Sequence, residues 1–148
     1  MMSFALFRLV VVMAVSAVVP ACAQTAPSVI AAPRDAADAM AAAVAAQDAD
    51  AIARLYMPDA ILLGPGASLV AGQDAIRAVW VQNLKGGMRA LTFDDVRTEH
   101  GTDRAAVTWT WTAGMAWSGQ SFTGRSLVYF SLTPDGWRIS ADMWQPAP

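Results

Sequence analysis

The apolar residues of this chain change their spacing at Gly86-Gly87, and this change limits the fold more than any other feature. Before it, in stretches such as "GQDAIRAVWVQNLK", they recur every three or four residues, which is typical of one helix face. After it they alternate, and Val107, Trp109 and Trp111 are separated by Thr residues. Helices followed by strands predict an α+β domain, with the helices packed on one face of an antiparallel sheet.

Three helices are expected before the change in spacing, with a small strand pair between the second and the third. Ala dominates the first helix and is the best helix former. Asp48 is a good N-cap for the second helix, Tyr56 ends it, and Pro58 prevents it from continuing. Four strands follow the change, and the last two are joined by a Thr-Pro-Asp-Gly sequence that suits a type I turn. The expected helices are residues 34–47, 48–56 and 72–87, and the expected strands are 60–63, 88–99, 104–114, 121–132 and 137–144.

The first 23 residues have the pattern of a secretory signal peptide. Arg8 precedes the apolar run "LVVVMAVSAVV", which is too short to span a bilayer comfortably, and Ala21-Cys22-Ala23 is a small-residue cleavage site. We therefore expect cleavage after Ala23 and a periplasmic or secreted protein. A second interpretation is a loose lipobox, in which Cys22 carries a lipid and anchors the protein to a membrane.

Composition predicts one domain, over residues 34–146, after a linker at 24–33. The chain has 148 residues, with 10 Lys and Arg against 12 Asp and Glu and a formal net charge of -2. The basic residues are scattered, which argues against a nucleic-acid partner. The chain has a single His, His100, in a polar turn, and cleavage after Ala23 would remove its single Cys. Since the sequence also has no Gly-rich dinucleotide motif, we expect no metal and no cofactor.

Four segments, taken in order, carry a resemblance to a known superfamily. They are "DADAIARLY", "DAILLGPG", "GQDAIRAVW" and "DGWRISADMW". Together they resemble the nuclear transport factor 2-like superfamily, and more closely its SnoaL-like branch, from about Arg34 to Trp144. The resemblance implies three helices packed on a strongly curved mixed or antiparallel sheet that forms a conical pocket, with dimers made through its outer face. The strand from Leu127 to Leu132 is apolar on both faces, which agrees with a homodimer because a strand covered on both sides needs a second layer.

The same branch resembles ketosteroid isomerases, in which one Asp is the base, and a Tyr and a protonated Asp hold the oxyanion. By that resemblance the base would stand just before the Pro of "LLGPG", where this chain has Gly64. We therefore expect the fold of these enzymes without ketosteroid isomerase activity.

Asp142 is the candidate catalytic residue. It lies among apolar neighbours in the last expected strand, and strict alternation puts it on one face with Arg138, Ser140 and Trp144. If that face lines the pocket, burial raises the pKa of Asp142 and prepares it for proton transfer. If it pairs with Arg138 or Arg125, its pKa falls and its role is structural. Its role is also structural if it caps a neighbouring backbone N–H. The sequence leaves both interpretations open.

The candidate ligand-binding residues are five aromatic side chains and one Arg. The Trp rings form a wall for a flat apolar ligand, or pack in the core or a dimer face. The Tyr hydroxyl donates into the pocket, or reaches solvent or a backbone carbonyl. The Arg binds a ligand carboxylate, neutralises Asp142, or lies at an edge or a dimer interface. These residues are Tyr56, Trp80, Trp109, Trp111, Arg125 and Trp144, with Trp117 as a further aromatic candidate.

The expected function is binding of a small, mostly apolar molecule in an aromatic-lined pocket, with no membrane partner unless Cys22 is lipidated. A second hypothesis is an acid–base enzyme of the isomerase, cyclase or dehydratase type, in which Asp142 moves a proton and Tyr56 or Arg125 stabilises negative charge. A third is a protein-interaction module with an exposed aromatic face. A cavity-facing Asp142 without an Arg partner favours the enzyme, and a Trp-lined void favours ligand binding.

Overall fold

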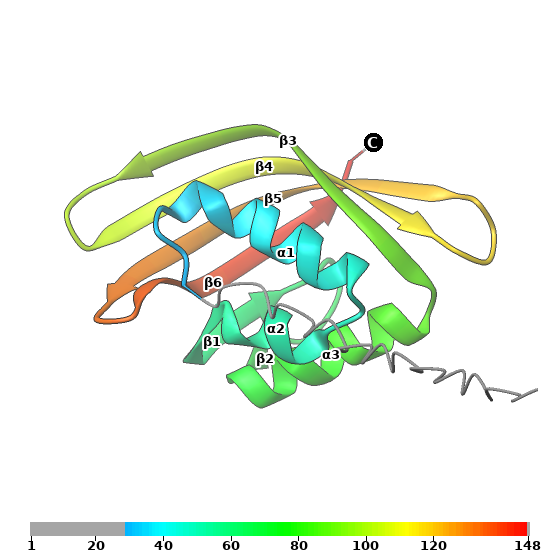
Figure 1. The fold of residues 1–148 in the computed structure, drawn as a ribbon, viewed down its shortest axis with the longest axis horizontal. Coiled ribbons are helices and arrows are strands. Elements are labelled where there is room, and N and C mark those ends of the chain that lie inside the picture. Colours follow the sequence, from blue (N-terminus) through cyan, green and yellow to red (C-terminus); the bar gives the residue numbers. More distant parts are fainter. Residues whose placement is uncertain (1–28, 148) are drawn as a thin grey trace, which may run out of the picture.

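The computed structural model describes residues 29–147, which form a curved sheet with helices on one face (Figure 1). The predicted signal peptide and its cleavage site lie outside the described residues. A 3-10 turn, η1 (Pro33–Asp35), leads into α1 (Ala36–Ala45), which is followed by α2 (Ala49–Arg54) and, after two strands, by α3 (Gln73–Lys85). None of the helices in this range is long and apolar enough to cross a membrane.

Six strands form the sheet, in the order β2-β1-β6-β5-β4-β3. Neighbouring strands are antiparallel except β1 and β6, which are parallel, so the sheet is mixed. The α+β class and the order of helices and strands are therefore confirmed. The strands are β1 (Tyr56–Leu63), β2 (Val70–Ala71), β3 (Met88–His100), β4 (Arg104–Met115), β5 (Ser121–Thr133) and β6 (Gly136–Pro146).

The second helix is shorter than predicted. Its N-cap is confirmed, since the Asp48 carboxylate accepts a hydrogen bond from Ala51 N at 2.8 Å. The helix ends at Arg54, however, and Tyr56 is the first residue of β1 instead of the last residue of the helix. Tyr56 pairs with Ile139 of β6, and this tertiary pairing outweighs the local helical pattern. The difference matters for function because it fixes Tyr56 beside the last strand.

Each helix buries one face against the sheet, as the spacing of its apolar residues predicts. Met40 and Val44 of α1 and Ile76 and Leu84 of α3 are all buried. In Figure 1, α1 crosses the concave side of the sheet, while α2 and α3 lie beside β1 and β2. We call this side of the sheet the inner face and the opposite side the outer face.

Alternation along the long strands separates these two faces. Val107 and Trp109 of β4 and Val128 of β5 are buried on the inner face. On the outer face, Leu127 is 49% exposed and Tyr129 is 45% exposed. The described chain therefore leaves apolar side chains uncovered on the outer face.

Candidate functional site

A cavity of about 500 Å³ lies between the inner face of the sheet and helices α1 and α3. This volume falls within the usual range for small-molecule sites. The described lining is mostly apolar, and its only charged side chain is Asp142. Its aromatic members come from α3 and from β3, β4, β5 and β6. They are Trp80, Phe93, Trp109, Trp111, Phe122 and Trp144.

An extra residue in β6 turns Asp142 toward this cavity. Tyr129 and Phe130 are consecutive in β5, but their partners in β6 are two residues apart, which leaves Ser140 as a β-bulge. The bulge reverses the alternation between Ile139 and Asp142, so both side chains are buried on the inner face. If Ser140 were paired regularly and formed no bulge, strict alternation from Ile139 would direct the carboxylate to the outer face.

Neither Arg considered as a partner reaches Asp142. The prediction that Asp142 shares a face with Arg138 and Ser140 is wrong, because the bulge separates them. The Arg138 guanidinium donates instead to the carbonyl oxygen of Arg54 at 2.8 Å. Arg125 is exposed on the outer face. Within residues 29–147, no ion pair involves Asp142.

Asp142 and Trp144 do share a face, as predicted, and Tyr56 holds the carboxylate. The Tyr56 side chain is fully buried, and its hydroxyl donates to Asp142 Oδ2 at 2.9 Å. Parallel pairing of β1 with β6 brings these two residues together although 86 positions separate them. The partner of this hydroxyl is therefore a carboxylate, and neither solvent nor a backbone carbonyl.

Burial controls the protonation of this pair. Removal from water raises the pKa of Asp142 from 3.8 to about 6, and the Tyr56 hydrogen bond offsets part of the rise. Burial, and then the charge of Asp142, raise the pKa of Tyr56 well above its usual value. Tyr56 therefore remains a hydrogen-bond donor, whereas Asp142 changes its charge near neutral pH.

Two buried polar atoms of the cavity have no hydrogen-bond partner among the described residues. They are Asp142 Oδ1 and Trp80 Nε1, on side chains that are 6% and 9% exposed. The cavity thus presents one free acceptor and one free donor.

The aromatic wall depends on a glycine in the opposite strand. Trp111 and Trp144 meet edge to face with ring centroids 5.7 Å apart, and Phe93 and Trp109 meet at 4.9 Å. Gly124 stands opposite Trp111 in the sheet, and a methyl group on Gly124 would overlap the Trp111 ring. A larger residue there would therefore displace part of the wall.

Gly64, at the position expected for the base of an isomerase, lies against the same wall. A methyl group at Gly64 would stand 3.3 Å from the Trp144 ring. An indole therefore lies next to the position where the resemblance would put a carboxylate. Among the described lining residues, Asp142 alone is ionisable in the range needed for proton transfer at neutral pH.

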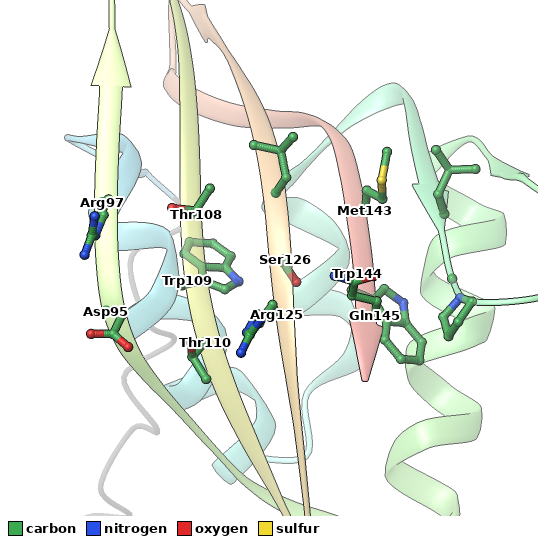
Figure 2. Close-up of a pocket in the computed structure, with 14 residues that line it drawn as sticks. Asp95, Arg97, Thr108, Trp109, Thr110, Arg125, Ser126, Met143, Trp144 and Gln145 are labelled. Atoms are coloured by element: carbon green, nitrogen blue, oxygen red, sulfur yellow. The ribbon is translucent and has the colours of Figure 1, made fainter. Parts of the chain in front are cut away.

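A second hollow, of about 760 Å³, lies on the outer face of the sheet (Figure 2). Arg97 of β3 and Arg125 of β5 both line it, with Thr108 and Thr110 of β4 between them. Arg125 is therefore grouped with Arg97 and not with Asp142. Trp117 is 76% exposed and lines neither hollow.

Of the predicted site residues, the structure brings together Tyr56, Trp80 and Asp142 with three further Trp side chains, and it separates Arg125 from them. Phe93 and Ser126 also line the cavity but were not predicted, although alternation along β3 and β5 could have identified them. No group of three His, Cys, Asp or Glu side chains in the described part of the chain could hold a metal ion.

The chain belongs to the SnoaL-like domain family, which it matches over residues 37–141. An NTF2-like protein with a cystatin-like fold from Novosphingobium aromaticivorans is 19% identical, with a TM-score of 0.67 over 76% of this chain and 78% of that chain. A ketosteroid isomerase-like protein from Erwinia carotovora is 20% identical, with a TM-score of 0.61 over 76% of this chain and 92% of that chain. These likenesses establish the fold of the superfamily. No curated protein is significantly similar in sequence to this chain.

Proposed function

We propose that this protein binds a small, mostly apolar molecule in its inner cavity. The observation that carries the proposal is the cavity itself, about 500 Å³ of space walled by Trp and Phe rings. Protein interiors normally pack such rings closely and leave few voids larger than a water molecule. An aromatic wall that stands around open space is suited to a flat apolar ligand.

Native mass spectrometry of the protein purified from the periplasm of a producing bacterium tests this proposal. We expect a small molecule to co-purify with the wild-type protein. Trp111→Ala, which removes part of the wall, should lose it, whereas Trp117→Ala, outside the cavity, should retain it. If no small molecule co-purifies, and apolar compounds added at high concentration also fail to bind, the proposal is wrong.

A second candidate function is acid–base catalysis by Asp142. Its support is a carboxyl group inside the cavity, without an Arg partner in the described chain, whose pKa is raised to about 6. In this role Asp142 Oδ1 takes a proton from a substrate carbon and returns it. Because Tyr56 is bonded to Asp142, it is a positioning residue, and the free Trp80 N–H is the group able to stabilise a developing oxyanion. Arg125 has no part in it, since it lies on the outer face.

Deuterium exchange into 2-tetralone in D2O, followed by NMR, tests this second candidate. The wild-type protein should accelerate exchange at the carbon next to the carbonyl, with a rate that rises through an apparent pKa near about 6. Asp142→Asn should abolish the acceleration, and Asp135→Asn, in the exposed turn before β6, should leave it unchanged. Equal rates for the wild type and Asp142→Asn would exclude the catalytic role for this substrate class.

Export and dimerisation complete the proposal. The pattern of the first 23 residues supports a periplasmic or secreted protein, and the mass of the mature N-terminus decides between cleavage after Ala23 and lipidation of Cys22. Exposed Leu127, Tyr129 and Met143 on the outer face support a homodimer through that face. Leu127→Lys should then convert a dimer into a monomer in light scattering. If the wild type is a monomer, this uncovered face favours the third hypothesis, a protein-interaction module.

A further inference from the structure

The unpaired polar atoms of the cavity indicate the polar group of its ligand. Asp142 Oδ1 and Trp80 Nε1 are buried, line the cavity, and have no partner among the described residues. Leaving a buried polar group unpaired is unfavourable. A ligand that supplies both missing partners therefore gains affinity over one of the same size and shape that supplies none.

The two atoms are the unpaired buried polar atoms of a mostly apolar wall. The Tyr56 hydroxyl occupies Asp142 Oδ2 at 2.9 Å, which leaves Oδ1 as the free oxygen of the carboxylate. Trp80 lines the same cavity, and its Nε1 is the second buried atom without a partner. A ligand in this cavity can therefore supply a partner to each of the two atoms.

The chemistry of these atoms excludes several ligand classes. A carboxylate or phosphate would face Asp142 without help, because the described lining contains no Arg, Lys or His. An ammonium group has only donors and would leave the Trp80 N–H unpaired. A ketone or an ether has only acceptors and would leave Asp142 Oδ1 unpaired. A hydroxyl group both donates and accepts, so one hydroxyl satisfies both atoms.

We propose that the ligand is an uncharged aromatic or polycyclic molecule with one hydroxyl group at its buried end. The hydroxyl donates to Asp142 Oδ1 and accepts from Trp80 Nε1, while the ring system lies against Trp111 and Trp144. This inference rests on the proposed ligand-binding function and adds to it the chemical class of the ligand.

A matched set of naphthalenes tests the inference by calorimetry at about pH 8, where Asp142 is ionised. The probes are 2-naphthol, 2-methoxynaphthalene, 2-methylnaphthalene and 2-naphthylmethylamine, which share one ring system and differ in the polar group. We expect 2-naphthol to bind about tenfold or more tightly than the methoxy and methyl compounds, since two hydrogen bonds to buried atoms distinguish them.

Two variants assign the preference to the two atoms. Trp80→Phe keeps the apolar ring but removes the N–H, and should weaken 2-naphthol about fivefold while leaving 2-methylnaphthalene unchanged. In Asp142→Asn, the amide oxygen still accepts from Tyr56, and the amide NH2 group faces the cavity in place of Oδ1. The cavity then offers two donors and no free acceptor, so 2-acetylnaphthalene, whose carbonyl oxygen only accepts, should bind more tightly than 2-naphthol. The matched controls, Trp117→Phe and Asp135→Asn, change the same residue types outside the cavity and should alter nothing.

Each outcome has one meaning. If all four naphthalenes bind the wild-type protein with similar affinity, the ligand-binding function stands and the hydroxyl inference is overturned. If the amine binds most tightly, the site prefers cations and the inference is likewise overturned. If none of them binds, the proposed function itself fails. The comparison of probes on the wild-type protein keeps the inference testable even if a variant does not fold.

Discussion

The protonation of Asp142 predicts an unusual dependence of stability on pH. In the folded protein its pKa is raised from 3.8 to about 6, because burial disfavours the charged form. Between these two values the folded protein holds a proton that the unfolded chain has lost. The free energy of unfolding therefore falls as pH rises through this window and is constant above it. When the pKa of a group differs by one between the folded and unfolded protein, the free energy of unfolding changes by about 1.4 kcal/mol. The rise from 3.8 to about 6 therefore corresponds to about 3 kcal/mol.

Urea unfolding of the wild type and of Asp142→Asn at a series of pH values measures this effect. Asn does not titrate, so other groups cancel in the difference between the two proteins. The free energy of unfolding of the wild type, minus that of the variant, should fall by about 3 kcal/mol between about pH 3 and about pH 7. A difference that stays constant for Asp142→Asn, or that rises with pH, would refute the account of a desolvated carboxylate, since a rise indicates a cationic partner.

Three further substitutions test the hydrogen bond to Asp142, the aromatic wall of the cavity and the exclusion of the outer face from the ligand site. Tyr56→Phe removes the hydrogen bond that favours the ionised carboxylate, so the pKa of Asp142, followed by NMR, should rise above its wild-type value; an unchanged or lower pKa would contradict this role. Gly124→Ala forces the Trp111 ring out of place and should cost about 1–3 kcal/mol of stability in urea unfolding, together with affinity for 2-naphthol; a variant as stable as the wild type would show that the wall is not tightly packed there. Arg125→Ala, on the outer face, should leave 2-naphthol binding within about twofold in calorimetry; a larger loss would place Arg125 in the ligand site after all.

The order and type of the elements could be predicted from the sequence because they depend on local patterns. Alternation in β4 correctly puts Trp109 and Trp111 on one face, and the 3.6-residue spacing in α3 correctly selects Trp80 for the buried side. The local pattern assigns Tyr56 to the second helix, which is wrong, because its strand conformation depends on pairing with β6, which is distant in the sequence. Local propensity cannot anticipate a contact of that kind.

The sidedness of Asp142 could not be predicted for a similar reason. Side chains alternate between the two faces only while every residue of a strand has a partner in the next strand. The single bulge at Ser140 therefore moves each later side chain of β6 to the face opposite the one that strict alternation predicts. Nothing in "WRISADMW" marks the bulge, because Ser is an ordinary strand residue whose hydroxyl bonds to Tyr129 O only once the strands have paired. The interior Gly124 was a usable signal of a close approach to an aromatic ring.

The indole N–H signals of the six Trp residues provide the most direct test of the inner cavity as a ligand site. A 1H–15N NMR titration with 2-naphthol reports each indole separately, and the chain supplies its own controls, because Trp117 and Trp137 do not line the cavity. We predict that the signal of Trp80 shifts most, that those of Trp109, Trp111 and Trp144 also shift, and that those of Trp117 and Trp137 do not. Shifts confined to Trp117 or Trp137, or no shifts at saturating 2-naphthol, would contradict the account.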